Sequence, residues 1–185
     1  TVLKGQHLDG APVIGGLDRL SLLKKSGVTH VVVAIEDGKH RATISQLVIR
    51  QGLELVSARH PATTISRRAK IGDGSIILPG CIIGIGATTG LSCVLGNGAS
   101  IDGDVVIEHY VTIESGSVVA SRACVGEGSV LGAGVTVAPA VKIGPWSIIP
   151  AGARVLEDIR SGSSPSRAEA READAAAPSS ASKTW

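Results

Sequence analysis

The stretch CVLGNGASIDGDVVIEHYVTIESGSVVASRACVGEGSVLGAGVTVAPAVKI, residues 93–143, repeats every six residues. In this register an aliphatic side chain recurs at every sixth position between Leu95 and Ile143. The register extends outward to Ile65 and Val155 without an insertion, and 15 of its 16 positions are aliphatic. Thr89 is the exception. Such regularity predicts a repeat architecture.

A period of six fits a triangular β-helix. An amphipathic helix repeats at about 3.6 residues and a half-buried strand at about 2. Three six-residue segments make one coil of a prism, and coils stack at about 4.8 Å, the ordinary spacing between strands. The fold class is therefore expected to be mainly β, a left-handed parallel β-helix over residues 61–160. Small residues or valine precede each aliphatic by two, and glycine often follows it, at positions 72, 84, 90, 96, 126, 132 and 144.

The amino-acid composition agrees with a core of small and branched aliphatic side chains, and it limits the classes of partner that the protein is expected to have. The chain is 43% hydrophobic but only 2% aromatic, with 24 Gly and neither Phe nor Met. The net charge of +2 favours no nucleic-acid partner. No apolar run approaches the ~18 residues of a membrane span. The first residues lack the apolar segment of a signal peptide, so the protein is expected to be cytoplasmic.

The three cysteines are expected to be structural. Cys81 and Cys93 occupy small-residue positions of the repeat, which predicts that they fill the core. Cys124 directly precedes an aliphatic, a position that allows it to face outward. No CxxC spacing is present, so neither a disulfide framework nor a metal site is predicted.

Residues 1–60 have a different pattern, that of a partial α/β Rossmann-like domain. Two helices and two strands alternate, and the first strand is a continuous apolar run of the kind buried in parallel sheets. No glycine-rich phosphate-binding turn is present. The helices are expected at residues 17–27 and 38–51, and the strands at 28–35 and 53–57.

Residues 161–185 are rich in Ser, Ala and Pro. Such a composition cannot bury enough apolar surface to fold, and predicts a disordered tail. A short helix within AEAREADAAA would be marginal alone.

Three stretches of residues 1–160 resemble sugar O- and N-acyltransferases of the sialic-acid O-acetyltransferase type, which are related to bacillosamine-pathway N-acetyltransferases. APVIGGLDRL…GVTHVVVAIEDGKHR resembles the second half of that family's nucleotide-sugar-binding domain. GLELVSARHPATTIS resembles its hinge. CVLGNGASIDGDVVI…GAGVTVAPAVKIG resembles its catalytic and acyl-CoA-binding coils.

This resemblance implies a homotrimer that binds acetyl-CoA between neighbouring prisms and acetylates a sugar or nucleotide sugar. A histidine would act as general base, oriented by an acidic neighbour, since imidazole titrates near neutral pH. Backbone N–H groups could stabilise the oxyanion. The residues that the resemblance assigns to the cofactor are Thr112, Gly132, Ala133, Gly134 and Ala151.

The chain departs from the family at the catalytic base. The family motif aliphatic-acid-His-acid corresponds here to residues 101–104, so Gly103 stands where the base is expected and Asp104 is the following acid. A second family histidine corresponds to Thr112. The family's apolar strand after Val155 is also missing.

His109, in an Ile-Glu-His sequence one hexad later, is the nearest histidine. Six residues correspond to a third of a turn, so His109 is expected at the next corner of the prism. It has three interpretations: a solvated corner residue, a substitute base in a rearranged site, or a residue of the trimer contact.

Two functions remain open, an acetyl-CoA-dependent sugar acetyltransferase and a catalytically impaired trimeric β-helix scaffold or binding protein. A γ-type carbonic anhydrase is excluded, because it needs three histidines on one metal. The predicted β-helix contains only His109.

Overall fold

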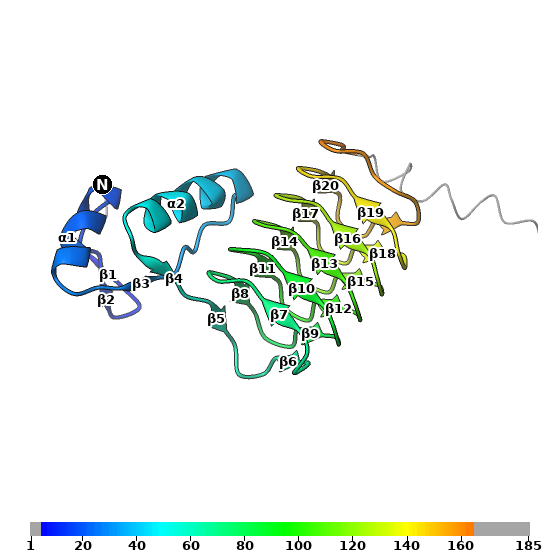
Figure 1. Cartoon of the computed structure of the whole chain (residues 1–185), viewed down its shortest axis with the longest axis horizontal. Helices are drawn as coiled ribbons and strands as arrows, with labels where there is room; N and C mark the ends of the chain where they lie inside the picture. The colour runs from blue at the N-terminus through cyan, green and yellow to red at the C-terminus, as the bar shows by residue number, and fades with distance from the viewer. Residues whose placement is uncertain (1–4, 165–185) are drawn as a thin grey trace, which may run out of the picture.

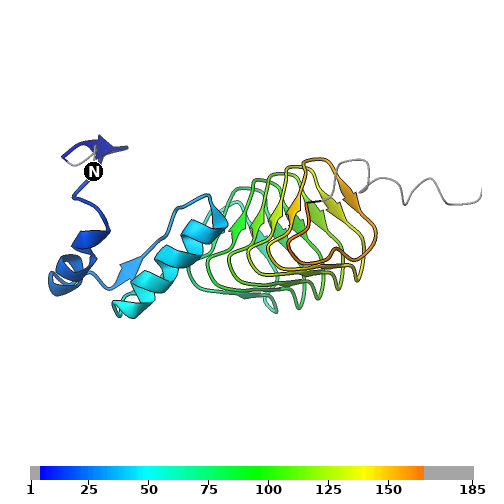
Figure 2. The ribbon, with the colours of Figure 1, turned by 90° about the horizontal axis from the view of Figure 1, so that it is seen from above.

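The computed structural model describes residues 5–164 and has two parts, a small α/β unit and a β-helix (Figure 1). The β-helix is left-handed, as in the acyltransferases it resembles, and the fold class is confirmed. Seen from above, helix α2 (Gly38–Arg50) lies beside the first coils of the prism (Figure 2).

Three parallel sheets form the faces of the prism, each pairing residues that are 18 apart. The β14 face contains β5 (Ala58–Arg59), β8 (Ile76–Ile77), β11 (Val94–Leu95), β14 (Thr112–Ile113), β17 (Val130–Leu131) and β20 (Ile148–Ile149). The β12 face contains β6 (Thr64–Ile65), β9 (Ile82–Ile83), β12 (Ser100–Ile101), β15 (Val118–Val119), β18 (Thr136–Val137) and β21 (Arg154–Val155). The β13 face contains β7 (Lys70–Ile71), β10 (Thr88–Thr89), β13 (Val106–Ile107), β16 (Cys124–Val125) and β19 (Lys142–Ile143).

The predicted aliphatic column fills the interior. The second residue of nearly every strand points inward, and from Ile77 to Val155 these side chains are at most 8% exposed. The small residues two positions earlier are buried beside them. Cys81 and Cys93 are both 0% exposed, and burial raises the pKa of Cys93 to about 11, so its thiol stays protonated at neutral pH. Cys124 is half-buried on an outward position.

Glycine serves two separate purposes at the corners. Gly132, directly after an inward Leu, has an ordinary φ, but a Cβ there would lie 2.6 Å from the backbone nitrogen of Ala151 in the next coil. Gly134, two residues later, has φ +68°, which a side chain disfavours. The glycine that follows the aliphatic therefore permits close coil contact, and the one two residues on makes the bend.

The N-terminal unit pairs two short strands in parallel, with α2 packed on them. The pair is β3 (His30–Val31) and β4 (Glu54–Leu55). A hairpin of β1 (His7–Leu8) and β2 (Ala11–Pro12) precedes η1 (Leu17–Arg19) and α1 (Leu20–Lys25). A separate small core joins α1, α2, β4 and the segment after β3: Leu20, Val33, Val48, Leu53 and Leu55.

The strand formed within the apolar run 28–35 is shorter than the composition of the run predicts. Only two of its residues pair, because β4 is its only neighbour among the described residues and is itself two residues long. Val32 is 42% exposed, whereas Val33 is buried. The run is thus not the fully buried parallel strand that was expected.

Pairing with the prism begins at Ala58, which is in register with Ile76. The predicted tail falls mostly on residues 165–185, outside the described residues. Within residues 5–164, neither helix has the length and hydropathy needed to cross a bilayer.

The interior column yields a stability test. Ile113 is the inward residue of β14 and is 0% exposed, whereas Ile82 is the outward residue of β9 and is 53% exposed. Replacing Ile113 with Ala should cost about 3 kcal/mol, from lost burial plus the cavity left behind. Ile82→Ala, the matched control, should cost about 0.5 kcal/mol or less. Urea unfolding monitored by circular dichroism measures both, and equal losses would contradict an inward-facing column.

Candidate functional site

The predicted site residues lie on three different corners of the prism. Gly103 and Asp104 lie in the turn after β12, here called the Gly103 corner. His109 lies in the turn after β13, the His109 corner. The residues expected to bind the cofactor gather elsewhere, on β14 and at the corner that follows it, the Ser115 corner: Thr112, Gly132, Ala133, Gly134 and Ala151.

The Gly103 corner is open and acidic. Gly103 has no positive φ, and a Cβ there would meet only ordinary contacts, 3.5 Å from the carbonyl oxygen of Ile85. The Asp102 carboxylate accepts hydrogen bonds from Ser121 Oγ at 2.6 Å and from the Gly103 N–H at 2.9 Å. These bonds, that of Ser121 foremost, lower the pKa of Asp102. Asp104 is exposed and has φ +57°.

The His109 side chain is exposed, but one of its ring nitrogens already accepts a hydrogen bond. Its Nδ1 accepts the backbone N–H of Leu91, in the coil before, at 2.9 Å. A backbone N–H can only donate, so a neutral imidazole in this geometry carries its proton on Nε2. His109 could therefore accept a proton only after giving up the Leu91 bond.

A cavity of about 420 Å³ lies where α2 meets the β14 face. Its size is in the range of small-molecule sites, about 300–1,000 Å³. The start of α2 forms one wall and outward side chains of the β14 face form another. Thr112 and Ala133 are the predicted cofactor residues that it includes. The cavity is lined by Glu36, Asp37, Gly38, Leu78, Val94, Gly96, Thr112, Ile113, Glu114, Ser115, Val130 and Ala133.

Arg41 of α2 is buried behind this cavity, with 0% exposure. Its Nε donates to the Ser92 carbonyl at 2.8 Å, and its Nη1 donates to the carbonyls of Ile35 and Glu36 at 2.7 and 2.8 Å. Its Nη2 completes the set, donating to the Tyr110 carbonyl at 2.8 Å and to Thr112 Oγ1 at 2.7 Å. All five N–H donors of the guanidinium are therefore used.

This guanidinium connects the two parts of the chain. Its partners are the loop before α2, two turns of the His109 corner, and β14. Burial lowers the pKa of Arg41, while Cys93 and Asp37 oppose that shift. Arg41 was not among the site residues predicted from the sequence, where the other face of this helix is apolar. The signal was the second face: Gly38, Arg41, Ala42, Ser45 and Val48, all buried, recur at helical spacing.

One backbone N–H group at the cavity, that of Ala133, already donates a hydrogen bond to a carboxylate. Glu114 Oε2 accepts the Ala133 N–H at 2.9 Å. Glu108 makes the equivalent bond at the His109 corner, accepting the Glu127 N–H at 2.8 Å. The Ala133 N–H is thus not free for a ligand while Glu114 holds this position.

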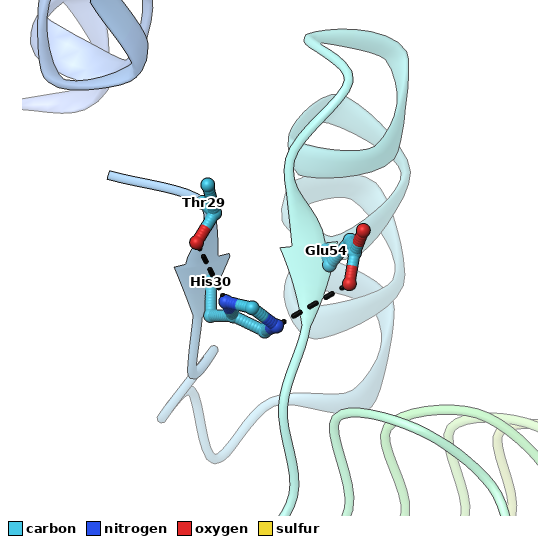
Figure 3. Close-up of polar contacts among 3 residues, drawn as sticks. All are labelled: Thr29, His30 and Glu54. Atoms are coloured by element: carbon cyan, nitrogen blue, oxygen red, sulfur yellow. Dashed lines mark hydrogen bonds and ion pairs between the residues drawn. The ribbon is translucent and has the colours of Figure 1, made fainter. Parts of the chain in front are cut away.

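A second cavity, of about 790 Å³, lies between the N-terminal unit and the start of the prism, with His30, Glu54, Arg59 and Asp73 among its lining residues. At its rim His30 bridges β3 and β4 (Figure 3). Its Nδ1 lies 2.7 Å from Thr29 Oγ1 and its Nε2 lies 3.3 Å from Glu54 Oε2. These side chains are well exposed, so the pair adds little stability.

Residues 5–164 contain no group of three or more His, Cys, Asp or Glu side chains able to hold a metal ion.

No protein-family model and no curated protein sequence matches this chain. Solved structures do match over both of its parts. GDP-perosamine N-acetyltransferase from Caulobacter crescentus, as a histidine-to-alanine mutant with CoA and GDP-perosamine, has a TM-score of 0.84 and 29% identity. The match covers 85% of this chain and 75% of that one.

Two further structures agree. PerB from Caulobacter crescentus, with CoA and GDP-perosamine, is 30% identical over 83% of this chain and 74% of its own, with a TM-score of 0.82. The acetyltransferase domain of PglB from Neisseria gonorrhoeae, with acetyl coenzyme A, is 26% identical over 86% of this chain and 77% of its own, with a TM-score of 0.79.

The substitution Arg41→Lys tests whether Arg41 holds the N-terminal unit against the β-helix. Lysine has three donors instead of five, so buried carbonyls lose partners. The free energy of unfolding should fall by about 3 kcal/mol, and amide exchange should rise first in residues 30–56. Arg50→Lys is the matched control on the same helix, where the exposed Arg50 makes one bond, 3.3 Å, to Gln46. A change in the control as large as in Arg41→Lys would refute the assignment.

Proposed function

We propose that this chain, which belongs to the left-handed β-helix sugar acyltransferases built from hexapeptide repeats, transfers an acetyl group from acetyl-CoA to an amino or hydroxyl group of a sugar or nucleotide sugar. The observation that carries the proposal is the match across both parts to N-acetyltransferases that hold CoA and GDP-perosamine. A match to the β-helix alone would support far less, since fold by itself does not define function.

The proposed active unit is a homotrimer. Within one chain the Gly103 corner joins the β12 and β13 faces, so it lies opposite the β14 face and its 420 Å³ cavity. One chain therefore separates the expected base position from the expected cofactor residues. Packing three prisms side by side would set the Gly103 corner of one copy near the β14 face of the next. The location we propose is the cytoplasm, where acetyl-CoA and nucleotide sugars are available.

The chemistry is attack of the acceptor nitrogen or oxygen on the thioester carbonyl, followed by cleavage of the C–S bond. The attacking group must lose a proton, and a general base typically contributes about 10²–10⁴-fold to such a step. Gly103 supplies none. An acceptor amine that binds already deprotonated would still react, because proximity and orientation lower the barrier by themselves.

A non-catalytic trimeric scaffold or binding protein is the second candidate. The combination of Gly103 at the base position with the engaged Nδ1 of His109 favours it. Calorimetry with acetyl-CoA separates the two candidates, followed by mass spectrometry of a panel of nucleotide amino and neutral sugars incubated with acetyl-CoA. Binding and an acetylated product support the enzyme. Absence of both supports the scaffold.

Gly103→His tests whether the site lacks only its base. A Cβ fits at this position without a backbone clash, so a side chain can begin there without moving the neighbouring coil. Acetyl transfer should rise by about 10²-fold, with a rate that increases as pH passes through about 6.5, where imidazole becomes neutral. Gly103→Ala is the control, since it adds the Cβ without a base. A rise of the same size in Gly103→Ala, or no rise in Gly103→His, would contradict the assignment of this corner.

A further inference from the structure

Thr112, the outward residue of β14, is only 8% exposed and lines the 420 Å³ cavity together with residues at the start of α2. Its Oγ1 accepts a hydrogen bond of 2.7 Å from Arg41 Nη2. The guanidinium is held in place by four other hydrogen bonds to backbone carbonyls. The position of the Thr112 oxygen is thus fixed from behind by a buried cation.

The direction of this bond determines what the hydroxyl can offer. A guanidinium has no acceptor, so the Thr112 oxygen receives the hydrogen bond and its own hydrogen stays available. No hydrogen bond from the Thr112 hydroxyl to an acceptor is found among residues 5–164, and Thr112 is one of the residues that line the cavity. A donor whose oxygen already accepts from a cation is polarised and donates more strongly.

The other groups around the cavity restrict the ligand. Glu36, Asp37 and Glu114 are among its lining residues, and their charges disfavour an anionic group such as a phosphate. Glu114 also occupies the Ala133 N–H. A neutral carbonyl oxygen fits best, because it accepts from Thr112 and carries no charge to be repelled.

We propose that Thr112 donates its hydrogen bond to the carbonyl oxygen of the bound thioester, and that Arg41 is the positioning residue that fixes and polarises it. This inference rests on the proposed acetyltransferase function. As the nucleophile attacks the carbonyl carbon, the C=O electron pair moves to oxygen. The Thr112 hydrogen bond, supported by the Arg41 guanidinium 2.7 Å from the Thr112 oxygen, stabilises the resulting oxyanion against the repulsion of the lining carboxylates. The pair then re-forms the carbonyl, the C–S bond breaks, CoA leaves as a thiolate, and the proton of the nucleophile passes to solvent.

The test uses hydroxylamine as nucleophile, since it needs neither a sugar site nor a base from the protein. Thr112→Val removes the hydroxyl with little change of shape, and Thr112→Ser retains it. Thr88→Val is the matched control, an outward, part-buried threonine at the same strand position on the β13 face. Each variant is checked for its fold by circular dichroism.

The expected result is a kcat about 10²-fold lower in Thr112→Val, with KM for acetyl-CoA nearly unchanged, because oxyanion donors act mainly in the transition state. Thr112→Ser and Thr88→Val should stay within about threefold of the original protein. A Thr112→Val protein with an increased KM and normal kcat would overturn the inference.

A second measurement does not depend on turnover. Infrared difference spectra of acetyl-CoA labelled with ¹³C at the carbonyl should show the bound C=O stretch shifted to lower frequency, and Thr112→Val should abolish that shift. Bound acetyl-CoA without a shift would overturn the inference while sugar acetylation, measured separately, could still stand. A protein that binds no acetyl-CoA would overturn both proposals.

Discussion

Stacking of aliphatic side chains inside a three-sided tube is the constraint on which the rest of this molecule depends. Each inward residue packs on the one 18 positions away, and each coil pairs its backbone with the next. Because successive residues of a strand point to opposite sides, a slip of one residue would turn the whole column outward. The outward residues and corners are therefore fixed in space by the same register, and site residues can be placed only where that register presents them.

Arg41 has a different role, because it attaches the α/β unit to the prism through buried hydrogen bonds. The strands of the β-helix pair with one another, but the carbonyls of Ser92 and Tyr110 at the His109 corner, and those of Ile35 and Glu36 before α2, accept hydrogen bonds from Arg41. One guanidinium with five donors satisfies four of them and the Thr112 hydroxyl. Such a buried charge is a poor source of stability, because its desolvation is costly. Its planar fork does specify one relative placement of the two parts.

The sequence was most informative where structure is periodic and least informative where it depends on distant neighbours. The column from Ile77 to Val155, the buried Cys81 and Cys93, and the assignment to a sugar acyltransferase family could be predicted, since each follows from a local pattern. The burial of Arg41 could not, because three of its five hydrogen-bond partners are 51 to 71 residues away along the chain. The Leu91 bond of His109 was hidden for the same reason: it crosses between coils. The short extent of β3 depends on how many strands flank it, which an apolar run does not reveal.

In the proposed acetyltransferase, glycine at position 103 shifts the burden of catalysis from activation of the nucleophile to stabilisation of charge on the electrophile. Asp102 and Asp104 remain at that corner, but a carboxylate whose pKa is lowered by Ser121 holds a proton poorly at neutral pH. Asp102 is therefore a poor replacement for an imidazole base. An acyl transfer still gains from stabilising charge on the carbonyl oxygen, and this does not require a titrating group. The Arg41–Thr112 pair combines a fixed position, a buried positive charge and a hydroxyl hydrogen, so it is the part of the proposed site whose chemistry does not require a histidine.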